Sequence, residues 1–143
     1  MSKRRLVDTN LIVRHLVQDD PQHAEIAGRL IEACDRGELI LVVLPAVVAE
    51  CVFVLESFYE IPRADLARVM ADLLSSPGIE LADLAIHLDA LERYARTQVH
   101  FVDCTIAATA ASNSLPVATF DSDFKRFPDV VVDLGENEST GRE

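Results

Sequence analysis

The sequence predicts an α/β domain of three layers, α/β/α, with a central parallel sheet of four to five strands. Short apolar runs recur between helical segments, which is typical of strands covered by helices on both faces of a parallel sheet. The length of 143 residues fits one domain, and half of the residues are hydrophobic, as in a compact protein with an aliphatic core. We therefore expect a single domain over residues 1–134, followed by a polar tail over residues 135–143.

Four runs have the composition of buried strands. They are RRLVD at residues 4–8, LILVVL at 39–44, PVATF at 116–120 and VVVDL at 130–134. The first of them ends in an acid, Asp8, where the chain is expected to bury its first strand. In parallel sheets, ligands bind beyond the carboxyl ends of the strands, so residues that directly follow these runs are candidates for a site.

Between the strands, apolar residues repeat with the helical period. The predicted helices cover residues 10–17, 21–37, 45–60, 63–76, 84–95 and 103–112, with a short helix at 122–127. Pro21 and Pro45 suit first helical positions, and Gly37 suits the left-handed residue after a helix. Asp83 and Asp103 are expected to cap the two helices that follow them.

Composition limits the classes of function. The formal net charge of −11 argues against indiscriminate nucleic-acid binding, but it permits divalent cations and a basic partner. The cysteines Cys34, Cys51 and Cys104 lie in apolar helical sequence without CxxC spacing, which favours small core residues in a reducing compartment. The sequence has neither a signal peptide nor an apolar stretch of bilayer length, so we expect a cytoplasmic protein without membrane contact.

Glu50 is the most informative acid. It stands alone in the apolar segment AVVAECVFVL, and a helix that is apolar all round is buried all round. An unpaired buried carboxylate costs several kcal/mol or takes up a proton. An arginine partner or a solvated edge would also account for Glu50, although no basic residue lies between Ala46 and Ile61. A bound cation explains it better.

The other acids are ambiguous one by one. Asp8 and Asp103 precede helices, and Asp121 with Asp123 lies in a turn before a short helix, so capping explains each of them. If the strands that end at Asp8 and Asp121 are neighbours, their carboxylates converge at one edge of the sheet. Grouped carboxylates repel each other unless a cation offsets them, and Mg²⁺ or Mn²⁺ prefers oxygen ligands. The acids together predict metal-dependent phosphodiester hydrolysis by metal-activated water.

Four motifs occur in an order and spacing that resemble PIN domains, and most closely the VapC-type toxins. They are LVDTNLIVRHL, PAVVAECVFVL, HFVDCTIAATA and VATFDSDF, and the resemblance covers about residues 6–134. It implies an endoribonuclease that depends on Mg²⁺ or Mn²⁺. The residues that match the catalytic, metal-binding acids are Asp8, Glu50, Asp103 and Asp121, with Asp123 as a further metal ligand.

Other matched positions are polar or basic. Thr9, Asn10 and Thr119 match residues that support the carboxylates, and Arg14, Lys125 and Arg126 are candidate contacts to RNA phosphates. His100 departs from the common pattern, in which an acid or a small polar residue stands three places before the Asp103 equivalent. It is expected either to assist proton transfer or to lie in a loop at the rim of the site.

The resemblance also implies partners. A VapB-type antitoxin would send a basic residue into the acidic pocket, and a homodimer would use exposed residues such as Phe58 and Tyr59. Alternatives remain: a PIN-type module that binds RNA or protein without cutting it, and a nuclease of RNA processing rather than a toxin. A phosphatase or phosphoacceptor with Asp8 as nucleophile is disfavoured, because the only lysines are Lys3 and Lys125 and no acid stands two residues after Asp8.

Overall fold

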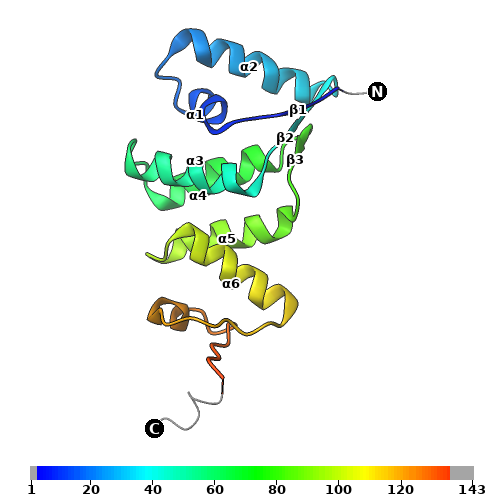
Figure 1. Cartoon of the computed structure of the whole chain (residues 1–143). Coiled ribbons are helices and arrows are strands. Elements are labelled where there is room, and N and C mark those ends of the chain that lie inside the picture. Colours follow the sequence, from blue (N-terminus) through cyan, green and yellow to red (C-terminus); the bar gives the residue numbers. More distant parts are fainter. Residues whose placement is uncertain (1–2, 136–143) are drawn as a thin grey trace. The chain divides into compact units, whose positions relative to one another are not determined.

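The computed structural model describes residues 3–135 of the chain, which divide into two compact units with the boundary between Leu84 and Ala85. The described residues form six α-helices and a parallel sheet, so the predicted α/β class is confirmed (Figure 1). Of the predicted polar tail, residues 136–143 lie outside the described part. No helix within residues 3–135 is long and apolar enough to cross a membrane.

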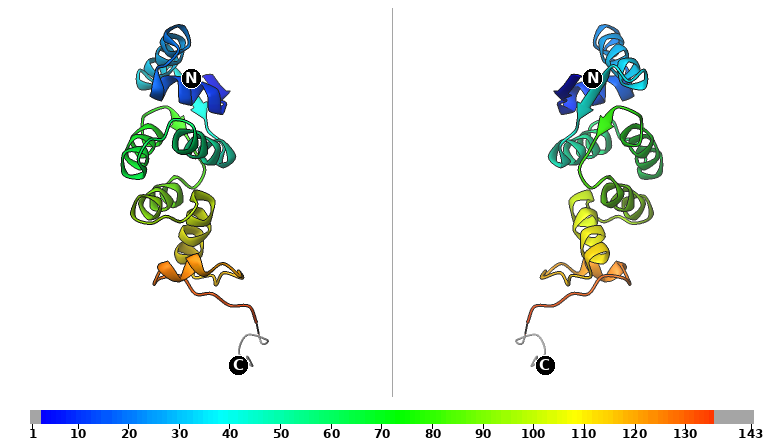
Figure 2. Two further views of the ribbon diagram at one scale, coloured as in Figure 1. Left: turned by 90° about the vertical axis from the view of Figure 1, so that its left-hand side faces the viewer. Right: turned by 90° about the vertical axis from the view of Figure 1, so that its right-hand side faces the viewer.

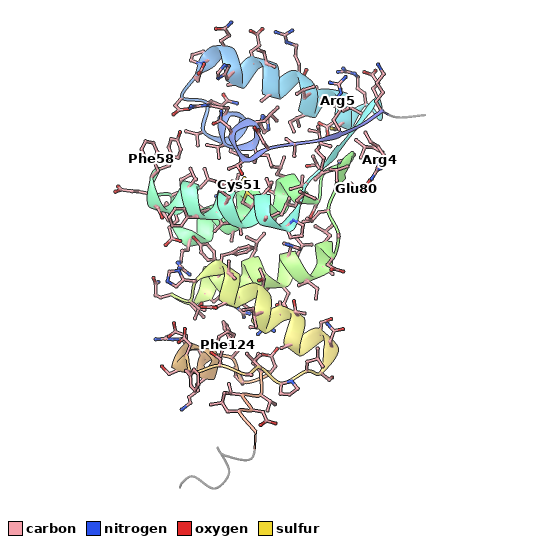
Figure 3. The ribbon with its side chains drawn as sticks, viewed as in Figure 1. Arg4, Arg5, Cys51, Phe58, Glu80 and Phe124 are labelled. Atoms are coloured by element: carbon pink, nitrogen blue, oxygen red, sulfur yellow. The ribbon has the colours of Figure 1, made fainter. Side chains whose placement is uncertain are left out.

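The first unit contains the sheet. Its elements are β1 (Lys3–Leu6), α1 (Thr9–Val17), α2 (Pro21–Asp35), β2 (Leu39–Val42), α3 (Pro45–Ser57), α4 (Arg63–Leu74) and β3 (Ile79–Glu80). The strands are parallel in the order β1-β2-β3, with Arg4 opposite Ile40 and Val42 opposite Glu80. At the end of the sheet, Arg4 of β1 pairs with Glu80 of β3, which Figure 3 shows.

Helices of the first unit pack on the sheet and on each other. In the first unit α2 packs on β2 and α4 on β3, while α1 contacts both α2 and α3. The helices α3 and α4 also contact each other, and Figure 2 shows them side by side and nearly end-on. Their fully buried side chains form the core of this unit and include Val48, Val52, Leu55, Leu66, Met70 and Leu74.

The first strand differs from its prediction. The segment before Asp8 was expected to be buried, but Lys3–Leu6 is exposed along its length, including Leu6. Within this sheet β1 is an edge strand with β2 as its neighbour, and Val7, after the strand, is the first buried residue. A short apolar run does not reveal whether its strand is central or at an edge.

The second unit is mainly helical. It contains α5 (Leu84–Arg96) apart from its first residue, α6 (Phe101–Asn113) and the 3₁₀ helix η1 (Ser122–Arg126). The rings of Tyr94 on α5 and Phe101 on α6 meet edge to face, with 6.0 Å between their centroids. Both side chains are buried, so this aromatic pair joins the two helices.

The sheet is smaller than predicted. Instead of strands over residues 116–120 and 130–134, the second unit has one parallel bridge between Val117 and Val132. Strand β3 has only two residues and was not predicted from the sequence. So short a strand has no alternation that a pattern can reveal, and a single bridge does not propagate into a ladder.

The three cysteines are free and buried, which confirms that they are core residues. A buried polar atom elsewhere was not anticipated. His15 on α1 has a buried Nδ1 without a hydrogen-bond partner among the described residues. Burial lowers the pKa of His15 below its ordinary value of 6.5, although the negative charge of Asp35 acts in the opposite direction.

The His15 imidazole is therefore expected to make stability depend on pH. Below pH 6.5 the unfolded chain takes up a proton at His15 that the folded chain binds less readily, so the free energy of unfolding falls as the pH falls through this range. In His15→Phe this loss should be absent. Urea denaturation between about pH 5 and pH 8 measures it, and parallel curves for the two proteins would contradict the prediction.

Candidate functional site

Asp8 lies where the sequence places it, directly before α1. It is the N-cap residue of this helix, and its Oδ1 accepts a hydrogen bond from the backbone N–H of Leu11 at 3.1 Å. Capping is therefore a real role of Asp8. The bond involves only Oδ1, so capping accounts for one of the two carboxylate oxygens of this exposed side chain.

Thr9 connects Asp8 with the acid on α3. The Thr9 hydroxyl donates a hydrogen bond of 2.5 Å to Oε1 of Glu50, which lies 41 residues away in the sequence. Burial, followed by the charges of Glu50 and Asp8, raises the pKa of the neighbouring Cys51 thiol to about 12. Both carboxylates thus act on the Cys51 thiol, which Figure 3 shows on α3. The Sγ atom of Cys51 lies 4.0 Å from the Thr9 carbonyl oxygen. The fold brings Asp8, Thr9 and Glu50 together.

The expected burial of Glu50 was wrong. Helix α3 buries Val48, Cys51, Val52 and Leu55, while Glu50 is exposed. The helix seemed apolar all round because its exposed face also carries large apolar side chains, such as that of Phe53. Glu50 is therefore positioned by the hydroxyl of Thr9 at the surface of α3 and not isolated in a core.

Asp103 occupies the first turn of α6. The helix begins at Phe101 with His100 as its N-cap residue, so the expectation that Asp103 caps it was wrong. A carboxylate in the first turn is still favourable, because the N-terminal end of a helix carries partial positive charge. Burial raises the pKa of Asp103, the charges of Asp121 and Asp123 raise it further, and His100 acts in the opposite direction.

Asp121 and Asp123 are held by local hydrogen bonds. Asp121 is the N-cap residue of η1, and its Oδ1 accepts a bond of 2.8 Å from the backbone N–H of Asp123. The backbone N–H of Asp121 in turn donates to the Thr119 hydroxyl at 2.9 Å. This turn holds two carboxylates near Asp103, and their charges reach it, as its raised pKa indicates.

The basic candidates differ in their surroundings. Nη1 of Arg14 is 2.8 Å from Oδ1 of Asp19, and the Tyr59 hydroxyl donates to the other oxygen of Asp19 at 2.8 Å. Nε of Arg126 lies 3.7 Å from Oδ1 of Asp123, whereas Lys125 is simply exposed.

Asn10, predicted to support the carboxylates, lines a small hollow between α1 and α2. Asp8 and Arg14 line the same hollow. Asn10 is thus placed beside Asp8, at the carboxyl end of β1.

The predicted acids therefore form two sets. Asp8 and Glu50 belong to the first unit, and Asp103, Asp121 and Asp123 belong to the second. Among residues 3–135, no group of three or more His, Cys, Asp or Glu side chains is arranged so that it could hold a metal ion. The donor chemistry of both sets nevertheless fits a hard divalent cation, because all donors are carboxylate oxygens and the charges beside Asp103 are unfavourable without a counterion.

The comparison with protein families identifies the class of protein. A family model described as the PIN domain matches residues 5–130, and the chain belongs to the PIN domain family. PIN domains are generally nucleases, that is, hydrolases, and they typically use divalent metal ions. A search of curated proteins found no significant match.

Sequence reasoning missed a cluster around Arg93 on α5. Its guanidinium is buried, binds the carboxylates of Asp89 and Asp129, and lies over the ring of Phe127. Asp89 and Arg93 are four residues apart, a spacing that predicts an ion pair on a helix. Nothing in the local sequence indicated Asp129, which lies 36 residues further on.

Proposed function

We propose that this protein is a Mg²⁺- or Mn²⁺-dependent endoribonuclease that acts as the toxin of a toxin–antitoxin pair. Membership of the PIN family supports nuclease activity in general. The resemblance of four motifs to VapC-type toxins supports the narrower role. The catalytic residues of the proposal are Asp8, Glu50, Asp103 and Asp121, with Asp123 as a further metal ligand.

The grouping of Asp103 with Asp121 and Asp123 supports this proposal, and the raised pKa of Asp103 reflects it. The cause of this raised pKa includes the charges of Asp121 and Asp123, so the second unit keeps like charges close together. Capping needs one carboxylate at each helix and gives no reason to assemble three. A cation-dependent nuclease gives that reason, because its metal ion and the phosphate need several oxygen ligands.

Each side chain has a separate task in the proposed reaction. Thr9 fixes the carboxylate of Glu50, and Thr119 fixes the backbone of Asp121. A bound Mg²⁺ or Mn²⁺, held by the carboxylates, would make water more acidic and offset the charge that develops on the phosphate. One of these carboxylates is expected to accept the proton of the attacking water. The products would carry a 5′-phosphate and a 3′-hydroxyl.

Removal of divalent ions is expected to abolish RNA cleavage. Purified protein should cleave a mixture of tRNA, ribosomal RNA and messenger RNA in Mg²⁺ or Mn²⁺, lose this activity in EDTA, and regain it when excess Mg²⁺ is added back. Gel electrophoresis of end-labelled RNA measures cleavage, and ligation of the products tests for the 5′-phosphate. Full activity in EDTA would refute the metal mechanism.

The partners form a second part of the proposal. A VapB-type antitoxin is expected to bind the acidic residues through a basic side chain, which suits a chain with a net charge of −11. Exposed Phe58, whose ring meets that of Tyr59 at 4.9 Å, is a candidate contact of a homodimer. Co-expression with the product of the adjacent upstream reading frame tests the toxin role. RNA that is bound but never cut would favour a silent PIN module, and cleavage without such an antitoxin would favour RNA processing.

A further inference from the structure

A hollow of about 450 Å³ lies in the second unit, and neither Asp103, Asp121 nor Asp123 is among the residues that line it. One wall comes from the C-terminal part of α5 and the other from the end of η1 and the residues after it. We call it the arginine hollow, and it is lined by Arg93, Arg96, Thr97, Arg126, Phe127, Pro128 and Asp129. Its size lies within the usual range for small-ligand sites.

Arg93 forms the fixed part of the arginine hollow. It is 8% exposed, and its Nη1 and Nη2 donate to the two oxygens of Asp129 at 2.9 and 2.6 Å. Its Nε donates to Asp89 at 3.1 Å, and its guanidinium carbon lies 5.2 Å from the centre of the Phe127 ring. Because two carboxylates and a ring already surround Arg93, it serves as a rigid wall and not as the group that binds a ligand.

Two other arginines lie at the rim with weak partners. The Arg96 side chain is 69% exposed and lies 3.3 Å from Glu92, one turn earlier on α5. Arg126 is 59% exposed and lies 3.7 Å from Asp123. Exposed ion pairs of this kind contribute little, so each guanidinium can exchange its carboxylate for a phosphate at a small cost in free energy. Guanidinium groups bind phosphate oxygens through two parallel hydrogen bonds.

Arg126 also connects the arginine hollow with the proposed catalytic acids. Its partner Asp123 accompanies Asp121, and the charges of both act on Asp103. Arg126 is therefore close enough to these acids to contact a phosphate that neighbours the scissile one. The Phe127 ring is buried under Arg93, so Pro128 is the exposed apolar residue of the hollow that a nucleobase can contact, and the arginines suit the phosphate.

We propose that the arginine hollow binds one nucleotide of the RNA strand beside the scissile phosphate, with the phosphate held by Arg96 and Arg126. This assignment rests on the proposed ribonuclease function and names a substrate subsite for it. In this assignment Arg96 binds the phosphate directly. Arg93 is a positioning residue, because its hydrogen bonds to Asp129 fix the wall of the hollow.

Binding of RNA to an inactive full-length protein tests the assignment. The probe is a fluorescein-labelled single-stranded RNA of about ten nucleotides, and the background is Asp103→Asn, which is expected to prevent cleavage. Arg96→Ala and Arg126→Ala should each weaken binding about tenfold, the effect of one charge-assisted contact. The slope of log affinity against log salt concentration should also decrease by about 0.7 for each lost phosphate contact.

The chain offers matched controls. Arg29 is 68% exposed and pairs with Glu25 one turn earlier, as Arg96 does with Glu92. Arg68 is 64% exposed and pairs with Asp65 three residues earlier, as Arg126 does with Asp123. Neither control lines the arginine hollow, so Arg29→Ala and Arg68→Ala should leave binding within about twofold of the background.

The outcomes separate this inference from the proposed function. If RNA is cleaved but Arg96→Ala binds it as well as Arg29→Ala does, the arginine hollow is not the subsite. If RNA is bound with the expected dependence on Arg96 but never cleaved by the wild type, the nuclease proposal fails and the arginine hollow stands as an RNA-binding site without a scissile phosphate. A third outcome is that a peptide of glutamates binds, that its affinity falls about tenfold in Arg96→Ala, and that RNA does not bind. The hollow would then take an acidic peptide, and the RNA assignment would be overturned. In the active protein, Arg96→Ala should raise KM and leave kcat within about twofold.

Discussion

Asp103→Asn is expected to reduce RNA cleavage by at least about a thousandfold. The amide keeps the shape of the side chain but removes its negative charge and its capacity to accept a proton. Asp103 is the acid whose pKa is raised by burial and by Asp121 and Asp123, so it lies where the proposed chemistry concentrates charge. Initial rates on end-labelled RNA in saturating Mg²⁺ measure the effect.

A loss of folding must be separated from a loss of chemistry. Near neutral pH the Asp103 carboxylate is charged in the unfolded chain, and its raised pKa means that this charge is less favourable in the folded chain. Asp103→Asn removes the charge, so its free energy of unfolding should be at least as large as that of the wild type. Asp72→Asn, an exposed acid on α4, should leave cleavage within about twofold of the wild type. A stable Asp103→Asn variant with wild-type cleavage would remove this residue from the proposed mechanism.

Gly78→Ala is expected to destabilise the fold by about 3 kcal/mol. Gly78 precedes β3 and has a φ of +78°, a conformation that side chains with a Cβ rarely adopt. A Cβ at this position would come within 2.6 Å of Cys34 Cβ and 2.8 Å of the Cys34 Cα and carbonyl oxygen on α2. Cys34 is itself buried, and its backbone cannot move without shifting the helix. Urea denaturation measures the free energy of unfolding.

Two other glycines separate the contribution of the backbone conformation from the contribution of the contact with Cys34. Gly37 has a φ of +77° but nothing within 4 Å of an added Cβ, so Gly37→Ala should cost about 1 kcal/mol from the backbone alone. Gly28 lies inside α2 with equally open space, so Gly28→Ala should stabilise the protein by about 1 kcal/mol. Equal losses for Gly78→Ala and Gly37→Ala would show that the contact with Cys34 is unimportant.

The sequence predicted most of what depends on neighbouring residues. The helices begin at Pro21 and Pro45 as expected, and Gly37 adopts the left-handed conformation after α2. Asp8 and Asp121 are N-caps, a role that the sequence analysis recognised as an alternative for both. These features depend on backbone groups within about four residues, so a local pattern is enough to determine them.

Tertiary packing decided the features that join distant residues. Only the fold places the Thr9 hydroxyl on Glu50, Gly78 against Cys34, and Arg93 on Asp129. It also leaves β1 at an edge and Glu50 on the exposed face of α3, against expectation. The sequence by itself thus determined the helices, the α/β class and the acids with the chemistry to serve a nuclease. Which faces are buried and which side chains meet depended on tertiary structure, because contacts over tens of residues are selected by the packing of whole elements and leave no periodic signal in the chain.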